Sequence, residues 1–199
     1  MFADVACPFT HVGLRRLVEH RARLGRTEPV LVVRAWPLEL VNGEPLASDF
    51  IAEEVESLRA QVAPDLFAGF DRRAFPVSSM PALALAHAAY AAGVRTGERV
   101  SLDLRDALFE RGLDIGDDRV VAQLAAEHGL DVPDDEARAG VVADWEDGRR
   151  RGVLGSPQFF VEETGYFCPV LDIRRVDGHL RIRRDMEASE AFFSRCFAA

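Results

Sequence analysis

The chain has 199 residues, of which 33 are acidic and 24 basic, so its formal net charge is −9. This acidic balance excludes a nucleic-acid surface, which would need a basic patch. Every basic residue is an arginine, which also excludes lysine chemistry such as a Schiff base or a phosphate-loop lysine.

The length suits one domain, with or without an insertion, and 48% hydrophobic residues are ordinary for a globular protein. No apolar run approaches a membrane span, and no signal peptide precedes the first motif. We therefore expect a cytoplasmic protein without membrane contact. The apolar lead over residues 2–6 is short, so either the first strand is short or the true start lies upstream of Met1.

The three cysteines, Cys7, Cys168 and Cys196, are odd in number and widely spaced. This pattern is typical of neither a disulfide framework nor a zinc site, and we expect no metal.

The first element to carry chemistry is Cys7-Pro8-Phe9-Thr10. An apolar lead precedes it and apolar residues at helical spacing follow it, which places Cys7 where a strand gives way to a helix. Pro8 suits a first helical turn. Free backbone N–H groups and the helix dipole favour a thiolate there, so we expect a reactive cysteine. The alternative is a buried, inert thiol.

Two neighbours could tune this thiol. Thr10 lies one turn along, where its hydroxyl could donate to the thiolate and lower its pKa, or could simply fill space. His11 shares a helix face with Cys7 at i, i+4, and as imidazolium it would also favour the thiolate. The alternative for His11 is an exposed helix histidine.

After a polar break, the β-branched run Pro29–Val33 predicts the second, central strand, which Trp36 and Pro37 end. Strand, helix and strand then form a parallel unit. A turn is predicted over 42–45.

Helices are predicted over 47–61, 80–92, 97–111 and 118–128, each bounded by Gly, Pro or Asp. The alanine-rich helix over 80–92 should pack closely on a neighbour. Between the first two, the irregular segment 64–76 carries Leu66, Phe67, Phe70 and Phe75. These residues either line a groove above the thiol or plug the interface between the helical part and the core.

A further helix begins at Pro133-Asp134-Asp135 and runs to about Arg151, where a basic run suits its C-terminus. Pro157 then opens a buried strand over 158–161. Hairpin turns are predicted at 163–165 and at Asp177-Gly178, and an amphipathic helix over 186–197 closes the chain.

Two of these stretches carry a resemblance. Cys-Pro-aromatic-X near the start and Gly-X-X-Gly-X-Pro-X-Phe-Phe over 152–160 resemble the DsbA-like branch of the thioredoxin fold. Asp4, three residues before the cysteine, and the segments 34–40 and 107–117 agree with it. The resemblance implies an α/β, thioredoxin-like fold with an inserted all-helical domain. Its expected parts are 1–44 and 138–199 for the thioredoxin fold and 45–137 for the insertion.

The resemblance also implies a site. It predicts a cis peptide bond before Pro157, facing Cys7, with the Ser156 backbone pairing with a peptide or glutathione strand. We expect Cys7 and Thr10 to be catalytic. We expect the substrate-binding residues to be Pro8, Phe9, His11, Ser156 and Pro157.

One departure from the family shapes the functional expectation. Thr10 stands where dithiol members carry a second cysteine, so a disulfide between positions 7 and 10 is impossible. We expect thiol–disulfide chemistry on the single Cys7, of a glutathione-linked or isomerase type. The substrate would be a thiol or disulfide, of protein or glutathione type, with no tightly bound cofactor. Cys168 or Cys196 could resolve an intermediate instead, and a homodimer is one expectation from the family.

Two other classes stay open. The first is a glutathione-dependent enzyme resembling kappa-class glutathione transferases or 2-hydroxychromene-2-carboxylate isomerases. These usually carry a Trp-Gly-X-Asp-Arg-like segment where this chain has Tyr166-Phe167-Cys168-Pro169. The second is a binding module that kept the fold and lost the chemistry.

Overall fold

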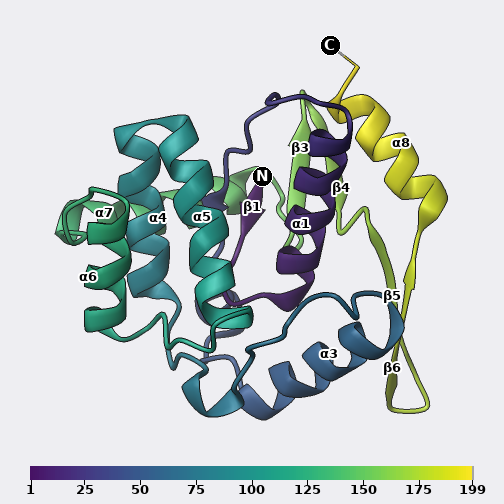
Figure 1. Ribbon diagram of the computed structural model, residues 1–199, viewed down its shortest axis with the longest axis horizontal. Coiled ribbons are helices and arrows are strands. Elements are labelled where there is room, and N and C mark those ends of the chain that lie inside the picture. Colours follow the sequence, from purple (N-terminus) through teal and green to yellow (C-terminus); the bar gives the residue numbers. More distant parts are fainter. Residues whose placement is uncertain (199) are drawn as a thin grey trace.

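The computed structural model describes residues 1–198 (Figure 1). The chain opens with β1 (Phe2–Ala3), α1 (Pro8–Arg23), β2 (Arg34–Ala35) and α2 (Leu38–Asn42). The helical middle comprises α3 (Ser48–Gln61), the 3-10 helix η1 (Arg72–Ala74), α4 (Met80–Ala92), α5 (Val94–Phe109), α6 (Asp118–Glu127) and α7 (Asp135–Arg150). The chain closes with β3 (Gln158–Val161), β4 (Thr164–Phe167), β5 (Leu171–Val176), β6 (His179–Arg184) and α8 (Met186–Cys196).

A four-stranded sheet of order β2-β1-β3-β4 holds the two ends of the chain together. β1 pairs with β2 in parallel and with β3 antiparallel, so Phe2 lies between Arg34 and Gln158. In Figure 1, α1 lies on one side of β1, and α4 and α5 lie on the other. This arrangement brings the N-terminus of α1 beside the start of β3.

The second strand is shorter than predicted. Pro29–Val33 lies outside β2, because β1 offers only two residues as parallel partners. The backbone before β2 is satisfied by side chains instead: the Leu31 amide donates to Glu98 Oε1 at 3.0 Å, and Tyr90 Oη donates to the Leu31 carbonyl at 2.8 Å. The strand prediction for 29–33 was therefore wrong.

The four predicted helices of the middle region are confirmed as α3, α4, α5 and α6, and the one after Pro133 as α7. Small residues allow α4 the close packing that its alanines indicate. A Cβ added at Gly97 would lie 2.1 Å from the Tyr90 ring, and one at Gly140 would lie 2.1 Å from His87. The short α2, which ends at Gly43 with φ +76°, was not predicted.

The aromatic segment before α4 belongs to the core. Phe67 is fully buried and Phe75 is 8% exposed, and the Phe67 ring lies 5.4 Å from that of Phe109 at the end of α5. Phe67 also contacts the His11 ring of α1, at 5.2 Å. These residues plug the junction between α1 and the helical middle, so the groove interpretation was wrong.

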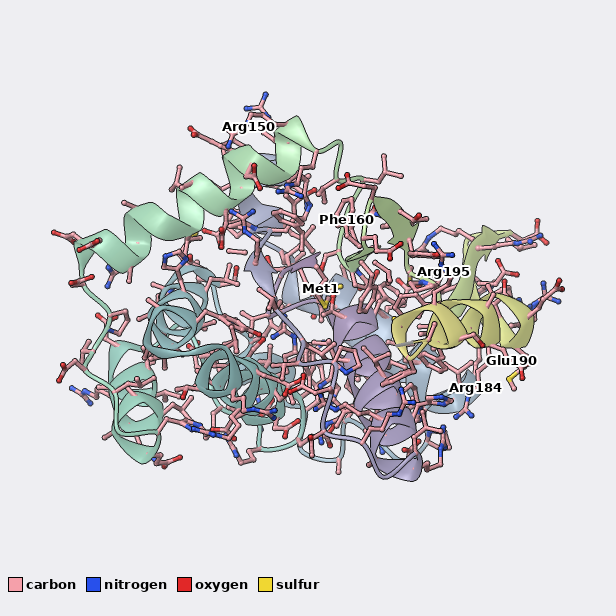
Figure 2. All side chains as sticks on the ribbon, turned by 90° about the horizontal axis from the view of Figure 1, so that it is seen from above. Met1, Arg150, Phe160, Arg184, Glu190 and Arg195 are labelled. Atoms are coloured by element: carbon pink, nitrogen blue, oxygen red, sulfur yellow. The ribbon has the colours of Figure 1, made fainter. Side chains whose placement is uncertain are left out.

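The C-terminal part contains two hairpins. β5 and β6 meet at the predicted Asp177-Gly178 turn, whereas the β3–β4 turn falls at Glu162-Glu163, one residue earlier than expected. Viewed from above, α8 lies beside α1, while α7, near Arg150, lies at the opposite side of the molecule (Figure 2). No helix among residues 1–198 combines the length and apolarity needed to cross a bilayer.

Gln61, at the end of α3, reaches the β5–β6 hairpin. Its side-chain amide donates to the Leu180 carbonyl at 3.1 Å and accepts from the Ile182 amide at 3.0 Å. The Gln61 side chain thus forms hydrogen bonds with the edge of β6 that faces away from β5, in the way that a further strand would.

Candidate active site

Cys7 stands at the junction that the sequence predicts. It is the N-cap residue of α1, with extended backbone, and Pro8 occupies the first turn. The Cys7 carbonyl accepts from the His11 amide at 3.2 Å. Its thiol donates to the Ser156 carbonyl oxygen at 3.3 Å, and only 3% of the residue is exposed. The first helical turn and the loop before β3 therefore meet at the sulfur.

Burial sets the acidity of this thiol. Removal from water raises the pKa of Cys7, and hydrogen bonds from Thr10 and Ser156 lower it without cancelling the rise. The direction of this shift is opposite to the one that the position at a helix N-terminus predicts. A helix N-terminus and two neutral hydrogen bonds favour the thiolate less than the loss of hydration disfavours it.

A chain of hydroxyl groups lies beside the sulfur. Thr10 Oγ1 and Ser156 Oγ are 2.8 Å apart, and Ser156 Oγ accepts from the Asp4 amide at 2.9 Å. Thr10 is fully buried. It both fills the position of the absent cysteine and lowers the pKa of Cys7 through its hydroxyl.

Asp4 belongs to the site, although the sequence did not identify it as a functional residue. Its carboxyl group is fully buried and accepts from the Ala6 amide at 2.8 Å, the Leu38 amide at 2.7 Å and the Ser79 hydroxyl at 3.1 Å. Burial raises the pKa of Asp4 despite these bonds. Its position three residues before Cys7 was the available signal, and its role is to fix the loop that leads into α1.

His11 does not serve the thiol. It is 1% exposed, its Nε2 lies 2.7 Å from Glu110 Oε1, and its ring contacts Phe67 and Phe109. Burial lowers the pKa of His11. Both predictions for His11 were therefore wrong: its ring is bonded to Glu110 rather than serving the Cys7 thiol, and it is not exposed. The substrate-binding assignment of His11 is corrected, because the side chain is enclosed at the α1–α5 junction.

The other predicted residues divide into two groups. Ser156 and Pro157 lie at the sulfur, and the peptide bond between them is cis. Pro8 is buried in the first turn of α1, and Phe9 is half-buried and packs on the core. The backbone of the Ser156–Pro157 loop is thus the part of the site that faces Cys7.

Of the two further cysteines, Cys168 lies near this loop. Its amide donates to the Pro157 carbonyl at 3.0 Å, in a left-handed backbone conformation with φ 44°. Burial, together with the charge of Cys7, raises the pKa of Cys168 to about 12. Cys196 is half-buried on α8 among the residues that pack around Phe192. Over the described residues, no three His, Cys, Asp or Glu side chains gather as a metal ion would require.

Comparisons with known proteins bear on the fold and the family. A search of curated proteins finds no match. Among solved structures, the chain is similar to the cytosolic disulfide reductase DsbM from Pseudomonas aeruginosa, with a TM-score of 0.62 at 15% identity, covering 99% of this chain and 94% of that one. At this identity the likeness shows the fold alone. The family model for the DSBA-like thioredoxin domain matches residues 1–181. The chain therefore belongs to the DSBA-like thioredoxin domain family, with a thioredoxin-like α/β fold and a helical insertion.

Proposed function

We propose that this protein carries out thiol–disulfide exchange on a single cysteine, Cys7, with a small disulfide of the glutathione type as substrate. The observation that carries the proposal is the position of Cys7 Sγ. It lies at the N-terminus of α1 and 3.3 Å from the Ser156 carbonyl that precedes Pro157. The fold of a cytosolic disulfide reductase at low identity supports the reductive direction and a cytoplasmic location.

The chemistry follows from the thiol and its neighbours. The Cys7 thiolate attacks one sulfur of the substrate disulfide, the S–S bond breaks, and the other half leaves as a thiolate. Cys7 then holds a mixed disulfide. A second thiol from solution attacks this bond and releases Cys7 as thiolate, because Thr10 supplies no resolving sulfur. Thr10 Oγ1 stabilises the negative sulfur at both stages.

Loss of the thiol proton also prepares the substrate contact. In the protonated state the thiol donates to the Ser156 carbonyl. A thiolate cannot donate, so ionisation frees this carbonyl to accept an amide of the incoming substrate. The small exposed area of Cys7 favours a peptide of glutathione size over a disulfide within a folded protein.

One observation favours a second candidate function. Because burial raises the pKa of Cys7, the chain could retain the fold as a binding module without exchange chemistry. The two candidates differ in a single measurable property, the reactivity of Cys7.

The test is the rate of Cys7 alkylation against pH, read by mass spectrometry, with and without oxidised glutathione. We expect a glutathione adduct on Cys7 that free thiol removes, and no adduct at this position in Cys7→Ser. Cys168→Ser is the matched control for the exchange cycle. If the adduct on Cys7 is released only when Cys168 is present, the single-cysteine cycle is wrong. If Cys7 forms no adduct at any pH at which the protein stays folded, the binding-module function replaces the proposal.

A further inference from the structure

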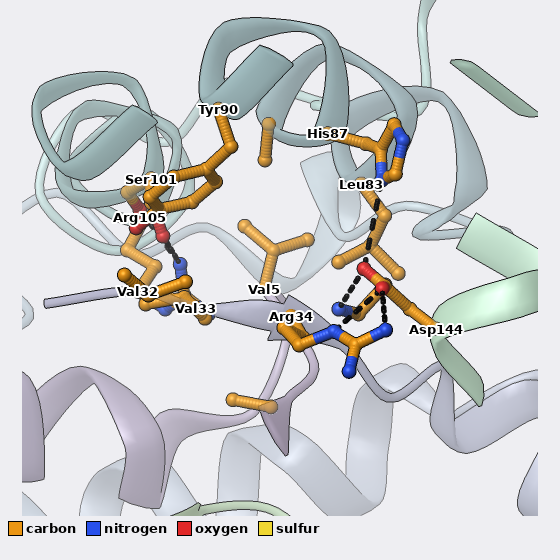
Figure 3. A pocket seen from close by; sticks show the side chains of 13 residues that line it. Val5, Val32, Val33, Arg34, Leu83, His87, Tyr90, Ser101, Arg105 and Asp144 are labelled. Carbon is orange, nitrogen blue, oxygen red and sulfur yellow. Dashed lines mark hydrogen bonds and ion pairs between the residues drawn. The ribbon is translucent and has the colours of Figure 1, made fainter. Parts of the chain in front are cut away.

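A second polar site lies on the α4–α5 side of the sheet. A cavity of about 210 Å³ is enclosed by β1, the segment that enters β2, and the helices α4, α5 and α7. Its middle is apolar, with Val5, Leu83 and Ala86 among the lining side chains. Figure 3 shows Tyr90, Ser101 and Arg105 at one end and Arg34, His87 and Asp144 at the other. Cys7 does not line the cavity.

Arg105 is a buried cation without an anionic hydrogen-bond partner. It is 2% exposed, and its Nη1 donates to the Ser101 carbonyl at 2.7 Å and to the Ser101 hydroxyl at 2.8 Å. Its Nη2 donates to the Asp4 carbonyl at 3.2 Å, and its Nε has no partner. Within residues 1–198 it forms no salt bridge. The nearby Asp4 carboxylate accepts from Ala6, Leu38 and Ser79 instead.

At one end of the cavity the positive charge of Arg105 has no anion in contact with it, and nearby acidic groups such as Asp4 and Asp106 act on it only through space. Burial lowers the pKa of Arg105 to about 10, so the guanidinium still carries its charge at neutral pH. A buried charge is strongly destabilising unless an opposite charge lies beside it. Neutral oxygens satisfy two of the three guanidinium nitrogens but do not balance the charge.

The other end of the cavity is electrically balanced. Arg34 pairs with Asp144 at 2.6 Å, and the same carboxylate accepts from the Ala35 amide at 3.1 Å and lies 3.5 Å from His87 Nδ1. Of the two ends, the Arg105 end is therefore the one at which an anionic ligand would pair with a cation. Val32 is 44% exposed, and the side chains of Arg34 and His87 are about one third exposed, which marks where the cavity reaches the surface.

We propose that this cavity binds a small organic monocarboxylate, with its carboxylate at Arg105 and its apolar body over Val5, Leu83 and Ala86. A planar guanidinium with a free Nε suits a carboxylate better than it suits a spherical ion. A dry cavity of about 150 Å³ accommodates benzene, so the 210 Å³ here has room for one ring and a carboxylate.

The test is calorimetric titration of the folded chain with benzoate. Benzamide, which has the same shape without the charge, is the comparison ligand, and chloride and phosphate are titrated at matched ionic strength. We expect saturable one-to-one binding of benzoate and binding of benzamide at least about tenfold weaker. No saturation by benzoate up to about 10 mM, or equal binding of benzamide, overturns the proposal. Displacement of benzoate by phosphate or chloride at equal concentration would make the site one for inorganic anions and overturn it as well.

Three variants locate the binding. Ala86→Leu fills the apolar middle and keeps Arg105, and we expect it to weaken benzoate binding at least about tenfold. Arg105→Met removes the charge at similar length and should have the same effect. Arg99→Met, at an exposed position on α5, should leave binding unchanged. If Arg105→Met fails to fold, Ala86→Leu alone decides, and unaltered benzoate binding by that variant overturns the proposal.

Discussion

The first turn of α1 directs two neighbouring polar side chains into different surroundings. Thr10 joins a neutral network with Ser156 beside the Cys7 sulfur, whereas His11 binds the Glu110 carboxylate at the junction with α5. Among the described residues, no charged group is hydrogen-bonded to Cys7 Sγ. The difference shows that the charged pair next to the motif, His11 and Glu110, connects the helical insertion to α1. The acidity of the Cys7 thiol is set instead by its burial and by the neighbouring hydroxyl groups.

The largest expected effect is on the His11 side. Glu110 accepts from the Phe67 amide at 2.8 Å and the Ala68 amide at 3.0 Å as well as contacting His11. Glu110→Ala removes all three contacts and leaves buried groups unpaired, so we expect the free energy of unfolding to fall by about 2 kcal/mol. Urea unfolding measures it, with the exposed Glu56→Ala of α3 as control. Equal stability of the two variants would contradict the structural role of this junction.

Acid should weaken the same junction. Burial acts to raise the pKa of Glu110, but the bonds from His11, Phe67 and Ala68 outweigh it and lower the value to about 2. The stabilisation is therefore complete above the unfolded pKa of about 4.5 and is lost as the pH falls towards 2. Burial lowers the pKa of His11 in the folded protein. As the pH falls, the histidine is therefore protonated in the unfolded chain before it is protonated in the folded protein. The free energy of unfolding should thus also decrease below about pH 6.5.

The pH dependence can be assigned to one residue. Thermal unfolding at a series of pH values should show the wild-type loss below pH 4.5, and Glu110→Gln should be less stable but lack most of this slope. A slope that is unchanged in Glu110→Gln would show that other carboxylates dominate acid unfolding.

A smaller effect is expected on the Thr10 side. Thr10→Val keeps the shape of the side chain and removes the hydroxyl that lowers the pKa of Cys7. We expect the alkylation rate of Cys7 at neutral pH to fall about tenfold, because a higher pKa leaves less of the thiol ionised. His11→Phe is the matched comparison on the other side of the turn. If His11→Phe slows alkylation as much as Thr10→Val, the two sides are not functionally separate.

The smallest effect concerns Cys168. With a pKa of about 12, this thiol stays protonated at neutral pH. Cys168→Ser should therefore leave the alkylation rate of Cys7 within about twofold of the wild type. A larger change would show that the two thiols share a proton or compete for the reagent, and intact-mass measurement after alkylation distinguishes these cases.

The helices and the loop at the candidate site could be predicted from the sequence because their signals are local. Asp and Gly boundaries set α6 and α7, and the Cys7-Pro8 pair set the start of α1. Pro29–Val33 has the composition of a strand, yet β2 begins at Arg34. Strand length depends on how many partner residues β1 offers, and the composition of one segment does not contain that number.

The site was predictable in position but not in electrostatics. Cys7, Ser156 and Pro157 meet as their motifs indicate, whereas the surroundings of His11 depend on Glu110, which is 99 residues away. The burial that raises the pKa of Cys7 likewise arises from segments distant in sequence. Helical periodicity places a side chain on a face but does not identify what covers that face.

The contact of Gln61 with β6 has a consequence for association between chains. A hairpin of two strands exposes backbone donors and acceptors along its outer edges, and such edges can recruit a strand from another molecule. Gln61 occupies the outward groups of Leu180 and Ile182 with one amide. The middle of the β6 edge is therefore unavailable for intermolecular β-pairing, because Gln61 of α3 already occupies its hydrogen-bonding groups.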